Sequence, residues 1–539
     1  MLIRRTFFLL AYLVIFSSSF AQQAWYVDPG GGNSQNGSLA LPWQTLAYAA
    51  TQVSVGDTIV LRAGNYTGDV TIATDDITVM SYPGEWAVVS APINDSNQGW
   101  ALWFNAAGGK VYNLELVGGY YYCIKIEAGN AIVKGSILHG SGRDCIKIVP
   151  NADNILIEQC EIYDSGLRDN SNAEGIDNVN ADQMVVRGCY IHDIATNAVY
   201  GKGGARNCLI ENNLIMDCGG GIQLGFFTDL QFFDPIENPN YHGNIDGIVR
   251  NNIVLRTEGP GIGMFAALRP VVLNNTLVEV AESSRGGIHF EPVENDAQLR
   301  YVVDPIVVNN VVTLSSNSSR TVIEDRNGGM TGNIELNYNR YHDADGNLTI
   351  RYGGGQVNWV QWQAAVPGGD PNSSVGDPLL NASFRPAVGS PLIDQGQSRP
   401  DLVLDYDYET RSGIIDIGAD EVSSICPELS VPPMVGTIGT GPVCSGGTLP
   451  IEEENEESEW GATHFKIYPN PSQGSVWIDL PAENGQLVVY DLMGSQIAIS
   501  PRKLTATHWQ LDGLPSGYLL VRWIDPLRKR VYSKRIWVD

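Results

Sequence analysis

Short apolar stretches recur along the middle of the chain, and each contains a cysteine or asparagine at the same position. Six of them align: ILIEQCEI from Ile155, MVVRGCYI from Met184, CLIENNLI from Cys208, GIVRNNIV from Gly247, PVVLNNTL from Pro270 and PIVVNNVV from Pro305. Their sixth residues are Cys160, Cys189, Asn213, Asn252, Asn275 and Asn310, and the shortest intervals are 23 and 24 residues. This period predicts a right-handed parallel β-helix, with the asparagines stacked as a hydrogen-bonded ladder.

A second apolar strand follows in each coil, and strand alternation turns the side chain after its inward isoleucine or valine outward. Adjacent coils lie about 4.8 Å apart, so outward residues of consecutive coils meet on one wall. Lys147, Asp177 and the strand of Tyr200 and Lys202 therefore occupy three successive levels. The predicted outward positions are Lys125, Lys147, Asp177, Tyr200, Gln223, Gly263 and His289, with Glu127, Lys202 and Glu291 two residues further on.

An insertion between residues 162 and 175 adds acidic side chains beside this wall. Asp169 and Glu174 lie in it, and their carboxylates, with that of Asp177, are candidate oxygen ligands for calcium. Calcium is the only cofactor that the sequence indicates, and no organic cofactor is expected.

A second insertion begins at Gly225 and is rich in aromatic residues. Phe226, Phe227 and Tyr241 either stack on sugar rings or pack the loop onto the coil. With Arg206, Gln223 and His289, they form the candidate substrate-binding set.

The first 21 residues have the pattern of a cleaved signal peptide. Arg4 and Arg5 precede an apolar run from Phe7 to Phe16, and small residues continue to Ala21. The apolar run is too short to cross a bilayer, so we expect export without a membrane helix. The formal net charge of −27 disfavours binding to nucleic acid. We expect the exported chain to be a monomer.

Four of the eight cysteines fall into two registers of the repeat. Cys123 and Cys145 share one register, and Cys160 and Cys189 share the other, so each pair should lie on neighbouring coils. That spacing permits a disulfide, but parallel side chains in register rarely meet the torsion it requires, so stacked thiols are favoured.

The start of the mature chain, WYVDPGGGNSQNGSLALPWQTLAYAATQVSVGDTIVLRAGNYTG, resembles the entry of secreted pectate-lyase-like β-helix proteins. There a short helix, here Trp43 to Val53, caps the first coil, which would otherwise expose apolar surface and unpaired strand edges. SPLIDQG from Ser390 and DIGADE from Asp416 resemble the closing segment of the same proteins. The resemblance implies a solenoid over residues 22–422, with its cap at about residues 22–57.

Residues 423–462 are rich in Pro, Gly, Ser and then Glu, which predicts a linker. Residues 463–539 contain FKIYPNPSQGSVWIDL, LVVYDLMG, LDGLPSGYLLVRW and SKRIWVD, and they resemble the C-terminal sorting domain of the type IX secretion system. The predicted fold is therefore all-β, a right-handed parallel β-helix followed by a small β-sandwich domain. The resemblance implies recognition by the type IX machinery and delivery to the cell surface or the medium.

The lysine, tyrosine and acidic residues predicted on this wall suggest cleavage of a uronic-acid polysaccharide by β-elimination. This reaction requires a cation to neutralise the uronate carboxylate and a base to remove the neighbouring proton. Lys202 is the candidate base and Tyr200 the candidate acid, with Lys147 or Arg206 as a carboxylate partner. Calcium bound to Asp177 would favour the neutral amine of Lys202.

The segment around Lys202 also resembles the lysine-bearing coil of the chondroitinase B and alginate lyase family. In that coil the lysine precedes a strand with two spaced asparagines, which Asn207 and Asn212 match. The resemblance implies an extracellular polysaccharide as the binding partner.

Two other functions are compatible with the same pattern. A β-helical glycoside hydrolase would pair Asp177 with Asp144, Asp169 or Glu174 as its two carboxylates. A non-catalytic surface protein would use the solenoid to bind glycans or to adhere, and this requires no catalytic pair. The lyase is the leading hypothesis.

Overall fold

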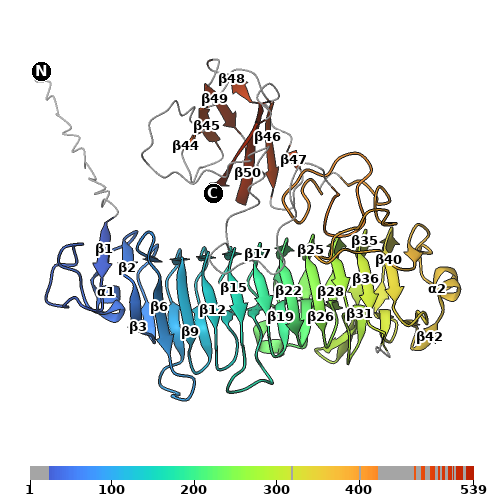
Figure 1. Cartoon of the computed structure of the whole chain (residues 1–539), viewed down its shortest axis with the longest axis horizontal. Coiled ribbons are helices and arrows are strands. Elements are labelled where there is room, and N and C mark those ends of the chain that lie inside the picture. The colour runs from blue at the N-terminus through green and yellow to red at the C-terminus, as the bar shows by residue number, and fades with distance from the viewer. Residues whose placement is uncertain are drawn as a thin grey trace, which may run out of the picture.

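The computed structural model describes residues 23–316, 320–399 and 402–422, together with most strand residues between 466 and 538. The predicted signal peptide and the predicted linker lie outside the described residues. Figure 1 shows the first part of the chain as a long solenoid whose coils follow one another in sequence order. The predicted β-helix is therefore confirmed.

Three long sheets form the walls of the solenoid, and each coil contributes one strand to each wall. The first sheet contains β1 (Ala24–Val27), β2 (Thr58–Leu61), β5 (Thr78–Ser81), β8 (Lys110–Tyr112), β11 (Ile132–Lys134), β14 (Leu156–Glu158), β17 (Val185–Arg187), β21 (Leu209–Glu211), β25 (Ile248–Arg250), β29 (Val271–Leu273), β35 (Ile306–Val308) and β39 (Glu335–Asn337).

The second sheet carries the candidate site. It contains β4 (Val70–Ile72), β7 (Trp100–Phe104), β10 (Tyr122–Ile126), β13 (Ile146–Ile148), β16 (Ile176–Val179), β19 (Asn197–Lys202), β23 (Gly220–Leu224), β27 (Ile262–Phe265), β31 (Gly286–Glu291), β37 (Thr321–Asp325), β41 (Ile350–Tyr352) and β42 (Gly355–Val357). Its strands pair in parallel except for the last, because β42 turns back antiparallel on β41.

The third sheet completes the coil. It contains β3 (Gly64–Thr67), β6 (Ala87–Ala91), β9 (Leu114–Gly118), β12 (Ile137–His139), β15 (Glu161–Tyr163), β18 (Tyr190–His192), β22 (Leu214–Cys218), β26 (Ile253–Thr257), β30 (Thr276–Val278), β36 (Val311–Leu314), β40 (Arg340–Asp343) and β43 (Ser374–Val375). A short five-stranded sheet adds β20 (Ala205–Arg206), β24 (Asn244–Ile245), β28 (Ala267–Leu268), β34 (Val302–Val303) and β38 (Met330–Thr331), and β32 (Val293–Asn295) and β33 (Gln298–Arg300) form a hairpin.

The register of the second sheet is the one predicted from the repeat. Ile176 pairs with Val199, and Val199 pairs with Ile222, so these residues occupy one inward column. All three side chains are fully buried in the core that runs along the inside of the solenoid. Residues far apart along the chain are therefore close neighbours on this wall.

The asparagine ladder is also confirmed. The side-chain nitrogen of Asn213 donates to the side-chain oxygen of Asn252 at 2.9 Å, and Asn252 donates to Asn275 at 2.9 Å. Asn275 donates in turn to Asn310, which donates to Asn339, both at 3.0 Å. Asn339 extends the ladder by one coil beyond the asparagines that the repeat predicts. The chain of bonds satisfies these buried amides from coil to coil.

A second asparagine column precedes the ladder and holds the closing segment. Asn212, Asn251, Asn274 and Asn309 have positive φ values, from 49° to 60°, which asparagine tolerates better than most residues. Their side-chain nitrogens donate to backbone oxygens of Asp405, Leu404, Asp416 and Gln397, respectively. The end of the solenoid domain therefore runs back along its own turns.

The six cysteines of the described residues are free and buried, as the stacked-thiol prediction requires. The capping helix is shorter than predicted: α1 spans Leu46–Gln52, and the Thr45 side chain accepts a hydrogen bond from the backbone of Tyr48. At the other end, α2 (Trp359–Ala365) covers the last coils and buries Trp362. Among the described residues, no helix is both long and apolar enough to cross a membrane.

The C-terminal region forms two four-stranded antiparallel sheets, drawn in dark red in Figure 1. One contains β44 (Lys466–Tyr468), β45 (Ser475–Asp479), β49 (His508–Asp512) and β48 (Arg502–Lys503), and the other contains β47 (Gln496–Ile497), β46 (Gln486–Asp491), β50 (Gly517–Asp525) and β51 (Arg530–Val538). Two such sheets are the elements of the predicted small β-sandwich.

Candidate functional site

Polar side chains of the second sheet lie in two columns along the solenoid axis. The first column has the predicted order, and strand pairing places Lys147 beside Asp177 and Asp177 beside Tyr200. The second column holds the residue two positions before the paired leucine, isoleucine or valine of each coil. Its members are Trp100, Tyr122, Asp144, Glu174 and Asn197.

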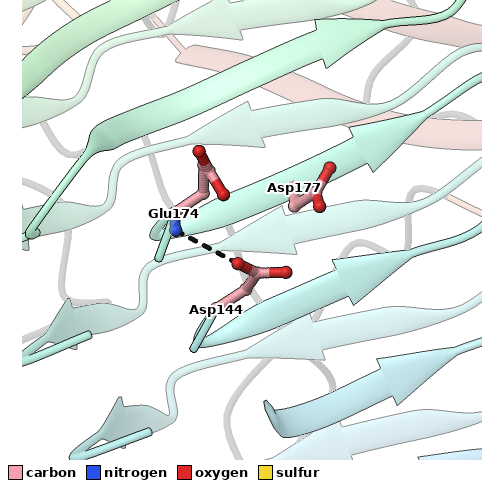
Figure 2. A group of neighbouring side chains, drawn as sticks. All are labelled: Asp144, Glu174 and Asp177. Atoms are coloured by element: carbon pink, nitrogen blue, oxygen red, sulfur yellow. Dashed lines mark hydrogen bonds between the residues drawn. The ribbon is translucent and has the colours of Figure 1, made fainter. Parts of the chain in front are cut away.

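The two columns bring Asp144, Glu174 and Asp177 together, and we call these residues the acidic cluster. Figure 2 shows Asp144 and Glu174 at the start of neighbouring strands, with Asp177 farther along β16. All three are buried, with exposed fractions of 0%, 4% and 1%, and one carboxylate oxygen from each lies within 4.8 Å of the others. The backbone nitrogen of Glu174 donates to Asp144 Oδ1 at 3.2 Å.

The cluster is electrostatically unfavourable as it stands. Burial raises the pKa of Asp144 well above its usual value, and the charges of Asp177 and Glu174 raise it further. The pKa of Glu174 is raised by the same causes, burial first and then Asp177. Asp144 Oδ2, Glu174 Oε2 and Asp177 Oδ1 are buried without a hydrogen-bond partner. Such oxygens require either protons or a cation.

These residues fit a divalent cation. Three carboxylates converge with one unpartnered oxygen each, and an all-oxygen donor set is the one preferred by calcium and magnesium. Two of the three predicted ligands, Asp177 and Glu174, belong to the cluster. Asp169 does not, because its carboxylate accepts hydrogen bonds from Arg143 at 2.9 Å and from Ser171 at 2.7 Å.

Two lysines border the acidic cluster. Lys147 forms an ion pair with Asp177, and although burial lowers the pKa of Lys147, the charges of Asp177 and Asp144 outweigh it and raise that pKa. The charge of Lys202 lowers the pKa of Glu174. The Lys202 ammonium nitrogen lies 4.2 Å from the centroid of the Tyr200 ring, and its side chain is half-buried.

Tyr200 lies beneath this surface and is fully buried. The Phe226 ring stacks on it with centroids 5.9 Å apart, and Phe226 also contacts the Phe265 ring at 5.0 Å. Burial, followed by the charge of Asp177, raises the pKa of Tyr200 well above its usual value. Tyr200 therefore supports Lys202 from below and has no surface for direct contact with a substrate.

The predicted substrate-binding residues do not lie together in the structure. Gln223 is adjacent to Tyr200 in the column, fully buried, with its amide atoms unpartnered. His289 lies four coils beyond Asp177, about 19 Å away at the usual coil spacing, buried between Glu291 and Glu324.

Arg206 and most of the aromatic residues hold the second insertion in place. The Arg206 guanidinium donates to the backbone oxygen of Glu237, and the Tyr241 ring packs on Phe233 with centroids 5.6 Å apart. The Phe226 ring is packed against Tyr200. Of the predicted aromatic set, only Phe227 keeps a large exposed fraction, 47%. Packing, rather than sugar stacking, thus accounts for most of this loop.

The sequence predicts Asp144 only as an alternative hydrolase carboxylate, and not as a cation ligand. The signal that identifies it is its position two residues before Ile146, which matches Glu174 two residues before Ile176. These residues lie at the corner where the chain enters the strand, and there simple alternation does not predict which side chains share a face.

The chain matches two family models. Residues 122–327 match the right handed beta helix region, and residues 466–538 match the secretion system C-terminal sorting domain. No curated protein matches the chain.

Several solved structures are similar to this chain. Pectate lyase Pel9A is 13% identical, with 75% of this chain and 97% of that chain covered and a TM-score of 0.43. An alginate lyase from Paenibacillus sp. str. FPU-7 is 17% identical, with 58% and 99% covered and a TM-score of 0.39. A GH136 lacto-N-biosidase from Eubacterium ramulus is 11% identical, with 61% and 65% covered and a TM-score of 0.43. At these identities a neighbour's reaction says nothing about this chain, so its function is inferred from its own residues.

The sorting domain marks proteins that type IX secretion exports to the cell surface or the extracellular space. The chain is therefore an exported right-handed β-helix protein with a secretion system C-terminal sorting domain.

Proposed function

We propose that this protein is a cation-dependent polysaccharide lyase that cleaves a uronic-acid glycan by β-elimination. The observation that carries the proposal is the buried acidic cluster, with unpartnered oxygens and raised pKa values for Asp144 and Glu174, directly beside two lysines. A carboxylate-bearing substrate would not approach three buried acids unless a cation offset their charge.

Asp144, Glu174 and Asp177 would hold the cation, and calcium is the expected one. Bound there, calcium would offset the charge of a uronate carboxylate and favour the uncharged amine of Lys202.

The two lysines take different roles in this proposal. Lys147, whose pKa is raised by Asp177 and Asp144 in the cation-free protein, is the proposed partner of a uronate carboxylate, because its ammonium already lies beside Asp177 at the edge of the cluster. Lys202 removes the proton next to that carboxylate, the freed electron pair forms the double bond of the ring, and the glycosidic oxygen leaves and takes up a proton from water. Tyr200 positions Lys202 through its ring, because its burial favours this role over direct proton donation.

Absorbance measurements test the proposal directly. The purified chain is incubated with polygalacturonate, alginate or glucuronan, with calcium or with excess chelator. We expect an ultraviolet-absorbing unsaturated product from one of these polymers, and we expect chelator to abolish it. Cleavage at an unchanged rate in chelator would contradict the role of the cation.

One observation favours a second function, glycoside hydrolysis. Burial raises the pKa of Asp144, as a general acid requires, and one of its carboxylate oxygens lies within 4.8 Å of one from Asp177, close to the separation of about 5 Å found in retaining hydrolases. New reducing ends without ultraviolet absorbance would identify a hydrolase. Binding without either product would identify a non-catalytic glycan-binding protein.

A further inference from the structure

Arginine and tyrosine side chains form a second feature, one coil on the N-terminal side of the acidic cluster. Tyr120 and Tyr121 directly precede β10, and their rings meet edge to face with centroids 4.7 Å apart. The backbone nitrogen of Arg143 donates to the backbone oxygen of Tyr121 at 2.9 Å. Because Asp144 follows Arg143 in the chain, the tyrosine pair lies beside the cluster on the same wall.

Arg168 is fixed on this tyrosine pair. Its guanidinium carbon lies 3.9 Å from the centroid of the Tyr120 ring, and its Nε donates to the Tyr120 backbone oxygen at 2.9 Å. The backbone beside it is fixed too, because Leu167 N donates to Ser141 O at 3.0 Å. The insertion thus presents one arginine in a defined orientation, held by a ring, a carbonyl and the preceding coil.

Arg168 differs from the neighbouring cations in having no acidic partner. Arg143 is paired with Asp169 at 2.9 Å, and Lys125 is paired with Glu127. Among the residues that the structure describes, no carboxylate pairs with Arg168. Its Nε is used by the Tyr120 carbonyl and its Nη2 is buried, but the residue as a whole is partly exposed, so an anion would approach at Nη1. In a chain of net charge −27, a positioned arginine without a carboxylate is suited to an anion from outside the protein.

We propose that Arg168, held on Tyr120 and Tyr121, binds a carboxylate of the acidic glycan one subsite to the N-terminal side of the acidic cluster. This inference rests on the proposed function, because it takes the glycan to run along the axis from the cluster towards β7. A guanidinium binds a carboxylate through a charge-assisted hydrogen bond, and a neutral sugar offers no equivalent.

Kinetics on the polymer that the chain cleaves tests the subsite. Arg168→Gln removes the charge but keeps an amide donor for the Tyr120 carbonyl, and Arg168→Ala removes both. We expect either variant to raise KM about 10-fold, the loss of one charge-assisted hydrogen bond, with kcat nearly unchanged. The matched control is Arg269→Ala, because Arg269 is an exposed arginine paired with Asp246 on the five-stranded sheet side.

Thermal unfolding in calcium shows whether each variant is folded. If Arg168→Ala is unfolded, Arg168→Gln alone tests the subsite. An unchanged KM for Arg168→Gln, with calcium-dependent cleavage intact, would overturn the subsite and leave the proposed function standing. If the chain cleaves none of the polymers, calorimetric titration with oligogalacturonate and with its carboxyl-reduced counterpart replaces kinetics. Binding that prefers the acidic form and is lost in Arg168→Gln supports the subsite, whereas equal binding by both proteins, or none, overturns it.

Discussion

Replacing Asp144 with asparagine is expected to lower the affinity for calcium about 100-fold and to remove cleavage at limiting calcium. Asparagine has the same shape, and its side-chain oxygen can still accept the hydrogen bond from the Glu174 backbone nitrogen, so the fold should be kept. Calcium dependence of the initial rate of product formation measures the effect. Cleavage with wild-type calcium dependence would contradict the assignment of Asp144 as a ligand.

In the absence of a cation, Asp144→Asn should make the folded protein more stable. The folded-state pKa of Asp144 is raised above the unfolded value of about 3.9. The contribution of Asp144 to the free energy of unfolding is therefore complete below the unfolded-state pKa. It is lost as the pH rises through the raised folded-state pKa. At a pH above the raised pKa, and with chelator present, Asp144→Asn should therefore unfold at a higher temperature than the wild type.

Asp169→Asn is the matched control for this experiment. Asp169 lies in the same insertion as Glu174, but its carboxylate pairs with Arg143 outside the acidic cluster. We expect Asp169→Asn to keep wild-type calcium affinity. A large loss in this variant, with none in Asp144→Asn, would support the ligand set predicted from the sequence over the one assigned from the structure.

Replacing Lys202 with alanine is expected to lower kcat about 1,000-fold, because the variant has no general base at the proton that is removed. The ultraviolet absorbance assay measures this loss under saturating calcium. Lys125→Ala is the matched control, since Lys125 lies in the neighbouring outward column, beside Lys147, and is already paired with Glu127.

Lys202→Arg separates two roles for this side chain. Arginine keeps the positive charge but does not give up its proton at the pH of the assay. If Lys202 acts as the base, Lys202→Arg should be as inactive as Lys202→Ala. Recovery of activity in Lys202→Arg would show that the lysine only binds the substrate.

The repeat made the solenoid and its register predictable from the sequence. Aligning the repeated strands, with insertions set aside, gives every coil the same register, so the pattern predicts Lys147, Asp177 and Tyr200 as neighbours. The ladder followed for the same reason. Asn339 was overlooked because its coil lacks the paired asparagines, reading LNYN where the others read NN.

The corners and insertions could not be read in this way. Asp144 lies at a corner, where the chain turns and alternation fails. Asp169 lies in an insertion whose path depends on its contact with Arg143. Strand alternation predicts an outward, accessible Tyr200, but the second insertion folds Phe226 over it. In each case, the position of the side chain depends on loop contacts that the period of the repeat does not encode.

Calorimetric titration of calcium into the chelator-treated, desalted chain tests the central claim most directly. The structure predicts a saturable site that is lost in Glu174→Gln, because that variant lacks one of the three converging carboxylates. The absence of calcium binding by the wild-type chain, or equal binding by wild type and Glu174→Gln, would contradict the claim that Asp144, Glu174 and Asp177 form a cation site.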